Sequence, residues 1–277
     1  MKNILYFLCA AAALASCSSS YNIQGTSDVQ NLDGHMMYIK AIEGNELKSI
    51  DSCDVVHGKF EFRGTIDTIK VGTLFINDEG VMPVVLEEGD ITIKFNTAKQ
   101  TCTGTFLNDK LTDFIEKYNQ ITNQIADLSH QEAQAMMNGE DMSAVYRDLQ
   151  KKSISLSEES DKLITSFIEQ NFDNVLGPFV FRMVTSTYEV PMTNAWIEAL
   201  MLKATDSFKN DRYVKEFMEE ANRIQAISTG MDDPTPAVPE APADGKVDTP
   251  PTPNEMANPQ KEVGNEKLHH TEWKYSQ

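Results

Sequence analysis

The chain has 277 residues, with 24 Lys or Arg against 42 Asp or Glu, so its formal net charge at pH 7 is −18. This acidic balance disfavours binding to the phosphate backbone of nucleic acids and to anionic lipid headgroups, and it favours a well-solvated protein. The length allows one substantial core or two small domains.

The first residues have the pattern of an export signal. The segment MKNILYFLCAAAALASC carries one lysine and then an apolar run from Ile4 to Ala13. This run is about half of the roughly 20 residues that a membrane-spanning helix requires, so it predicts the core of a signal peptide. The four residues that end at Cys17, Leu-Ala-Ser-Cys, resemble the lipobox of bacterial lipoproteins. The resemblance implies that residues 1–16 are removed and that Cys17 is acylated.

Acyl chains on Cys17 imply anchoring in a membrane, with residues 17–20 as a short tether. Residues 18–20 are uncharged. They include neither the aspartate that tends to retain such proteins in the inner membrane nor the acidic cluster that marks surface export in some lineages. We therefore expect the outer membrane, with the protein facing the periplasm. The alternative is an ordinary secretory signal in which the cysteine occurs by chance.

Residues 21–106 have the pattern of β-strands. The segments KFEFR and DITIKF alternate apolar and polar residues, as half-buried strands do. Turn residues separate these from five other short apolar runs, which are MMYIKAI, KSIDSCDVV, VGTLFIN, VMPVVLEE and QTCTGTF. The pattern predicts an antiparallel β-sandwich of about seven or eight strands. Because proline cannot donate to a sheet ladder, Pro83 indicates an edge strand.

Residues 107–229 have the pattern of helices. From Asn108, a plausible N-cap, apolar residues recur at helical spacing as far as Leu128, and a second long helix is predicted from about 142 to 172. The two form a predicted antiparallel hairpin. Shorter helices are predicted over 177–188, 193–205 and 211–228, with Pro178 and Pro191 at helix starts. The fold class is therefore α+β: a sandwich followed by a helical region.

Residues 230–277 have a different composition. Eight of the eleven prolines lie between 229 and 259, among small and acidic residues. Such a segment buries too little apolar surface to offset the entropy of chain ordering, so it predicts a disordered tail. The final LHHTEWKYSQ is either a docking element or a solvated terminus, and we expect the latter.

No familiar catalytic signature occurs in the chain. It has no Cys-x-x-Cys, Gly-x-Ser-x-Gly, His-Glu-x-x-His or glycine-rich phosphate loop, so we expect no catalytic residue, no cofactor and no metal. Cys53 and Cys102 would remain after acylation of Cys17. They either pair or stay free, and we expect two free thiols. Asp51 either satisfies turn amides, as we expect, or belongs to a binding cleft.

One modification motif remains. Asp67-Thr68-Ile69 resembles the three-residue O-glycosylation sequon of some Gram-negative periplasmic proteins, which implies a glycan on Thr68.

Three segments in order, IDSCDVVHGKFEFRG, VVLEEGDITIKF and CTGTFLNDKLTDF, resemble an uncharacterised N-terminal domain of envelope lipoproteins. Many of those proteins continue through a helical connector into a thioredoxin-like thiol-disulfide oxidoreductase domain. The likeness covers residues 21–229 and implies a β-rich domain with its connector. This chain has the proline-rich segment where the oxidoreductase domain would start, so the redox activity is not implied.

We therefore expect a non-catalytic envelope lipoprotein that interacts with an envelope protein or ligand. The alternative is an accessory to a periplasmic thiol-disulfide system, derived from a redox lipoprotein that has lost its catalytic domain. A third hypothesis is an enzyme with an unrecognised site in the sandwich.

Overall fold

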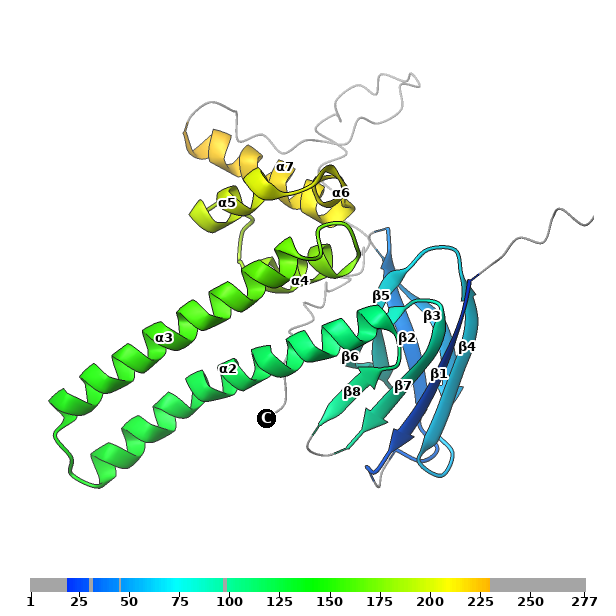
Figure 1. Ribbon diagram of the computed structural model, residues 1–277, viewed down its shortest axis with the longest axis horizontal. Coiled ribbons are helices and arrows are strands. Elements are labelled where there is room, and N and C mark those ends of the chain that lie inside the picture. The colour runs from blue at the N-terminus through cyan, green and yellow to red at the C-terminus, as the bar shows by residue number, and fades with distance from the viewer. Residues whose placement is uncertain (1–18, 30–31, 45, 97–98, 230–277) are drawn as a thin grey trace, which may run out of the picture. The chain divides into compact units, whose positions relative to one another are not determined.

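The computed structural model describes residues 19–29, 32–44, 46–96 and 99–229. The expected signal peptide, the acylated Cys17 and the proline-rich segment 230–277 lie outside the described residues. The described chain is α+β, with a β-rich N-terminal part followed by helices (Figure 1). This confirms the expected fold class.

Eight strands form two four-stranded sheets. One sheet has the order β4-β1-β7-β8 and the other the order β3-β2-β5-β6. Their bounds are Ser19–Ser27 (β1), Met36–Glu43 (β2), Glu46–Asp54 (β3), Lys59–Ile66 (β4), Lys70–Ile76 (β5), Glu79–Leu86 (β6), Gly89–Phe95 (β7) and Gln100–Thr103 (β8). Pro83 lies in β6, an edge strand, as predicted. The expectation of a purely antiparallel sandwich is wrong at one pair, because β1 and β7 run parallel.

The sandwich core follows the alternation of its strands. Phe60 and Phe62 on β4 point inward with Ile91 and Ile93 on β7, and all four are buried. Strand β1 starts at Ser19, two residues earlier than predicted, and none of the quoted apolar runs covers it. In β1 the buried positions alternate through Tyr21, Ile23 and Gly25, but Gly25 has no side chain to continue the apolar pattern. An added Cβ there would lie 2.0 Å from the ring of Phe60. Glycine at this position therefore makes room for the aromatic side chain.

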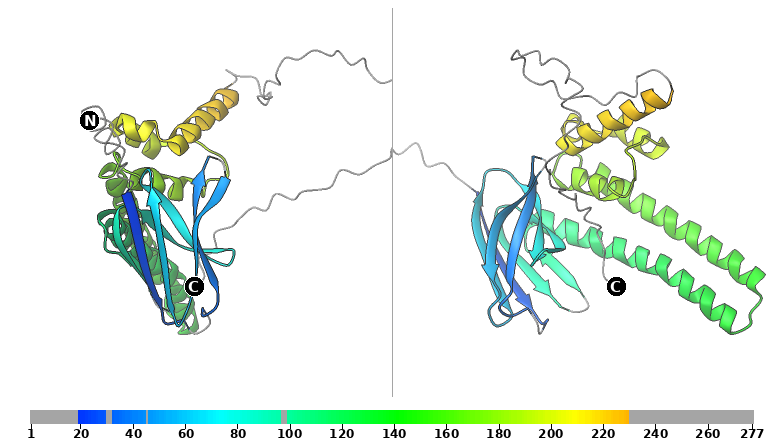
Figure 2. Two further views of the ribbon diagram at one scale, coloured as in Figure 1. Left: turned by 90° about the vertical axis from the view of Figure 1, so that its right-hand side faces the viewer. Right: turned by 180° about the vertical axis from the view of Figure 1, so that it is seen from behind.

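Two long helices follow the sandwich and lie side by side as an antiparallel hairpin (Figures 1 and 2). Shorter helices come next, and the full set is Phe106–Met137 (α2), Met142–Glu169 (α3), Leu176–Thr185 (α4), Ala195–Lys203 (α5), Asp206–Lys209 (α6) and Arg212–Ser228 (α7). The prediction was wrong for Pro191, which precedes the extended N-cap residue Asn194 and lies outside α5. It also missed the short helix α6.

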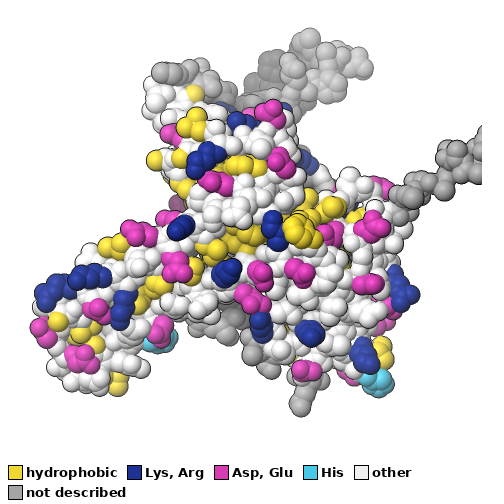
Figure 3. All heavy atoms as spheres, in the orientation of Figure 1, with side chains coloured by type: hydrophobic (Ala, Val, Ile, Leu, Met, Phe, Trp, Pro, Cys, Tyr) yellow, Lys and Arg dark blue, Asp and Glu magenta, His cyan; other side chains and the backbone are white. Residues whose placement is uncertain are grey.

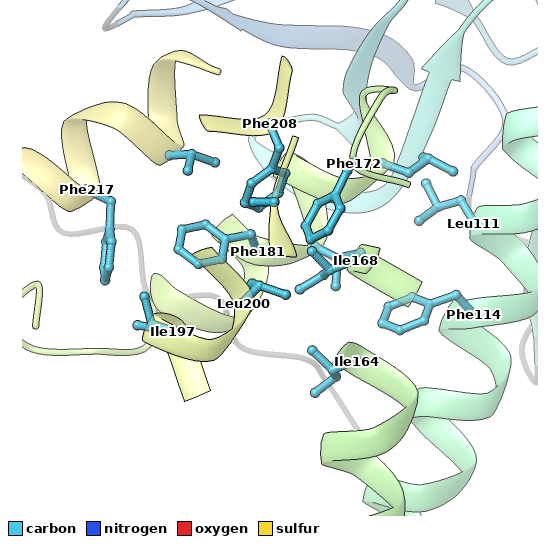
Figure 4. Close-up of a cluster of buried hydrophobic side chains, with 14 of the residues drawn as sticks. Leu111, Phe114, Ile164, Ile168, Phe172, Phe181, Ile197, Leu200, Phe208 and Phe217 are labelled. Carbon is cyan, nitrogen blue, oxygen red and sulfur yellow. The ribbon is translucent and has the colours of Figure 1, made fainter. Parts of the chain in front are cut away.

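The helices have their own aromatic core (Figure 4). Phe181 on α4 is fully buried, and its ring lies 5.7 Å from that of Phe208 and 5.4 Å from that of Phe217, both edge to face. Leu111 and Phe114 connect the first turns of α2 to this core. Val85 on β6 belongs to the same cluster, so one sheet contributes to both cores.

Candidate functional site

The largest group of buried polar side chains lies where the sandwich meets α2. Asn108 was expected to cap α2, but the N-cap residue is Thr105, and Asn108 lies one turn further on. The Asn108 side chain turns instead to strand β6. Its Nδ2 donates to the Val85 carbonyl at 2.8 Å, and its Oδ1 accepts from the Val85 amide at 2.9 Å. The side-chain amide thus acts as a strand partner for the free edge of β6.

The Thr112 side chain likewise acts as a strand partner for β8, the free edge of the other sheet. Its hydroxyl donates to the Cys102 carbonyl and accepts from the Cys102 amide, so α2 covers one edge strand of each sheet. The Cys102 thiol also donates to Oδ1 of Asn108, at 3.1 Å. One face of α2 therefore closes both β6 and β8 against pairing with another chain.

Glu87 supplies the cap that Thr105 does not. The Thr105 side chain makes no capping hydrogen bond, whereas Oε1 of Glu87 accepts from the amides of Leu107 at 2.8 Å and Asn108 at 3.1 Å. These amides are donors that the first turn of a helix leaves without an intrahelical partner, and a carboxylate is favoured there. Asp109 completes the junction by accepting from the amide of Gly104, at 2.9 Å.

These contacts satisfy the polar groups of the junction from within the protein. Among the described side chains, no buried nitrogen or oxygen atom lacks a hydrogen-bond partner. A catalytic or binding site keeps polar groups available for its ligand, whereas the groups here are used in holding α2 on the sandwich. We therefore assign a structural role to the junction.

Asp51 likewise has a structural partner. Its Oδ2 accepts from the Tyr21 hydroxyl at 3.0 Å, which links β3 in one sheet to β1 in the other. Its Oδ1 accepts from the amide of Ser52. Burial, together with the hydrogen bond and charge of Asp51, raises the pKa of Tyr21 well above its ordinary value. Asp51 thus has a structural role, but it lies within β3 and binds a tyrosine hydroxyl, rather than satisfying the turn amides that were expected.

Both cysteines are free thiols in the structure. Cys102 is buried in the junction, and burial is the main reason that its pKa is raised to about 12. Cys53 is half-buried on β3, and burial raises its pKa to about 11. Because the thiolate is the nucleophile in thiol chemistry, both environments disfavour reactivity at neutral pH.

The other predicted positions are not brought together. Thr68 is exposed in the connection between β4 and β5. Two of the histidines, His35 and His57, lie in hydrogen-bonded segments at one end of the sandwich, where Nδ1 of His57 is 3.9 Å from the Asp33 carboxylate, whereas His130 is on α2. Within the described ranges, no group of three or more His, Cys, Asp or Glu side chains is arranged to hold a metal ion. None of the helices described is both long and apolar enough to cross a bilayer.

A second feature, not predicted from the sequence, is the outer part of the α2–α3 hairpin, residues 122–160, which we call the arm. Beyond Ile121 the only fully buried residue of α2 is Ala135, and those of α3, Ile164 and Ile168, lie outside the arm. Four large apolar side chains of the arm are exposed, and Figure 3 shows hydrophobic side chains among charged ones over its surface. They are Met136, Met137, Tyr146 and Ile154.

The arm also carries a shallow groove near its tip. Ala135, Val145 and Leu149 provide its apolar lining, and Asp148 and Lys152 are charged residues beside them. Lys152 is not free, because its Nζ lies 2.9 Å from the Asp148 carboxylate. Apolar surface surrounded by polar groups is typical of protein-binding surfaces.

Comparison with known proteins finds a family match for the N-terminal part of the chain alone. Residues 21–111 match a family model described as a domain of unknown function (DUF4369), which covers less than half of the chain. This range spans the sandwich from β1 through the junction to Leu111, and the match agrees with the expected uncharacterised N-terminal domain. No curated protein matches the chain.

Proposed function

We propose that this protein is a non-catalytic envelope lipoprotein, acylated at Cys17 and held at the periplasmic face of the outer membrane, whose arm binds another envelope protein. The observation that carries the binding role is the arm itself. Its exposed apolar residues contribute little to either core, while the first turns of α2 are fixed by the junction and the last turns of α3 enter the helical core.

Two features support the non-catalytic part of the proposal. The polar groups of the junction bind one another, and the two thiols have pKa values raised by burial. The link to thiol-disulfide systems rests on the sequence resemblance, and the environments of Cys53 and Cys102 do not favour it.

Acylation is tested by growth with a radiolabelled fatty acid. The wild-type chain is expected to take up label, and Cys17→Ala is expected to take up none. The labelled chain should fractionate with the outer membrane and resist added protease until that membrane is permeabilised. Label in the Cys17→Ala chain would overturn the anchor.

Binding by the arm is tested with a photo-crosslinking amino acid placed in intact cells. Met137 is the position of choice, because its side chain is 86% exposed near the tip. Val56 is the matched control, since it is an apolar residue on the sandwich that is 59% exposed. We expect a discrete adduct with an envelope protein from position 137 and none from position 56. Equal adducts at both positions, or none at either, would remove the arm as the binding surface.

A further inference from the structure

Several chain segments close to the expected anchor, Cys17, lie at one end of the sandwich. The described chain begins at Ser19, which lies opposite Ile66 in the β1–β4 pair. The connection from β4 to β5 therefore lies beside Ser19. The β2–β3 turn is at the same end, because Nζ of Lys70 at the start of β5 lies 2.7 Å from Oε1 of Glu43 at the end of β2. Figure 1 shows these segments at the end of the sandwich where β1 begins. We call it the anchor end.

The anchor end exposes aliphatic side chains. Ile42 and Leu47 lie opposite each other in the β2–β3 pair and are 48% and 51% exposed. Ile69, in the β4–β5 connection, is 46% exposed. None of the three belongs to either buried cluster. Each is a branched aliphatic side chain that is stabilised when its exposed part is removed from water, and the three lie together at one end.

Covalent geometry fixes how far this end can be from the anchor. Ser19 is two residue steps from Cys17, and a fully extended chain spans at most about 3.6 Å per step, or roughly 7 Å in total. An acylated Cys17 lies at the membrane surface. Since the first strand starts within that distance, the anchor end is adjacent to the lipid.

We infer that the anchor end is a membrane-contacting surface, in which Ile42, Leu47 and Ile69 enter the interfacial region of the bilayer beside the acylated Cys17. The inference rests on the proposed acylation. Apolar side chains at this depth are stabilised by the area that they remove from water, and the covalent anchor supplies the proximity. The lipid thus orients the sandwich as well as holding it.

The charged side chains at this end bear on which lipid headgroups the surface can contact. Glu46, Asp67 and Glu88 are exposed carboxylates here, and Glu43 is paired with Lys70. Lys48 lies close enough to help lower the pKa of Glu43, and the guanidinium of Arg212 on α7 lies beside Gly44, so four carboxylates stand against three cations. Carboxylates are repelled by an anionic lipid surface. The contact therefore suits zwitterionic headgroups, such as those of phosphatidylethanolamine and phosphatidylcholine.

The test places an environment-sensitive fluorophore, NBD, on single introduced cysteines in the full acylated chain. Ile69→Cys and Leu47→Cys report on the anchor end. Val56→Cys is the matched control, because Val56 is exposed and forms a bridge with Lys59, which pairs with Thr26 at the far end of β1. Labelling at neutral pH favours the introduced thiols, since the pKa values of Cys53 and Cys102 are raised. A chain with no introduced cysteine gives the background.

The labelled chains are reconstituted into vesicles of phosphatidylcholine and phosphatidylethanolamine. We expect several-fold brighter, blue-shifted emission from positions 69 and 47, with strong quenching by doxyl-labelled phosphatidylcholine. Position 56 should keep the emission that it has in water. Phosphatidylglycerol in the vesicles should weaken the response at 69 and 47.

The possible failures are distinguishable. If the chain floats with the vesicles while positions 69 and 56 behave alike, the anchor stands and the contact is wrong. If the chain carries no acyl label and does not float, the anchor itself is wrong and the contact fails with it. The contact requires Thr68 to be unmodified, contrary to what the sequon-like Asp67-Thr68-Ile69 implies. A glycan on Thr68, read from the mass of the intact chain, would place a hydrated group in the same connection and would overturn the contact.

Discussion

The two ends of α2 differ in what their side chains do. At the first turns, Asn108 and Thr112 bind strand edges, Glu87 caps the helix, and Leu111 enters the helical core. At the other end, Met136 and Met137 are 58% and 86% exposed. The side chains that stabilise the fold and those proposed to bind a partner are therefore separated along a single helix. Substitutions at the first turns should act on folding, whereas substitutions at the arm should act on partners.

The largest effect is expected from Phe181→Ala, which removes the aromatic ring at the centre of the helical core. Truncation of a buried phenylalanine leaves a cavity and costs about 3–5 kcal/mol of unfolding free energy. Phe106→Ala is the control, because Phe106 is 71% exposed and its main contact is Lys110 above its ring. That change should cost less than about 1 kcal/mol. Urea denaturation of both variants measures the difference, and equal losses would contradict the assignment of the core.

The next effect is expected from Asn108→Ala at the junction. The change leaves the Val85 amide and carbonyl without their side-chain partner in a buried place, which costs about 1–3 kcal/mol for each group left unsatisfied. Asn119→Ala on an exposed face of the same helix should stay within about 0.5 kcal/mol of wild type. Exposed β6 should also promote self-association, which light scattering detects. A monomeric Asn108→Ala chain with wild-type stability would contradict the role of this side chain.

Thiol ionisation gives a smaller effect that depends on pH. The folded pKa values of Cys53, about 11, and Cys102, about 12, exceed the ordinary value of 9.0. The unfolded chain therefore loses these protons first, and the free energy of unfolding should fall as pH rises from about 9 toward 12. A Cys53→Ala/Cys102→Ala chain should lose less stability over this interval, because it lacks the two thiols. Some loss should remain, because Tyr21, whose pKa is also raised, is retained. Identical pH profiles would contradict the assigned thiol environments.

A mass-tagged alkylating agent tests the thiols directly. In the unreduced, denatured protein, both cysteines should react. In the folded protein at pH 7, Cys53 should react slowly and Cys102 more slowly still, because Cys102 is the more buried. Full protection of both in the denatured chain would show a disulfide instead.

The smallest effects are expected at the arm and the C-terminus. Met137→Ser should change the melting temperature by no more than about a degree, because this side chain is mostly in solvent. A chain that ends at Ser228, the last residue of α7, should melt within a few degrees of the full chain. Calorimetry measures both. A large drop on truncation would make LHHTEWKYSQ the first place to look for function.

Much of the architecture was predictable, because local periodicity determines it. The alternation in KFEFR and DITIKF and the helical spacing after Asn108 gave the sandwich, the hairpin and the confirmed fold class. The parallel β1–β7 pair was not predictable in this way. It depends on which strands meet in the folded sheet, and Gly25 weakens the pattern of β1.

The contacts of the junction and the exposed arm could not be predicted from the sequence either. Asn108 has the residue type of an N-cap, but its actual partner, Val85, is 23 positions earlier, and the true cap comes from Glu87, outside the helix. The helical apolar spacing was followed only to Leu128, and α2 continues through the mostly polar residues Ser129 to Gln134 to Met137, at the start of the loop expected over residues 137–141. Where a helix is polar on most faces, packing against a neighbour decides whether it continues.

The position of β1 in its sheet has a mechanical consequence. This strand lies between β4 and β7, paired with the first over eight positions and with the second over seven. A pull on an acylated Cys17 while a partner holds the arm would act along the strand. The ladder bonds on both sides would then be loaded in shear and would have to break together, rather than opening one after another from an end. If the proposed anchor and partner hold the two ends, the sandwich would transmit tension between them without unravelling.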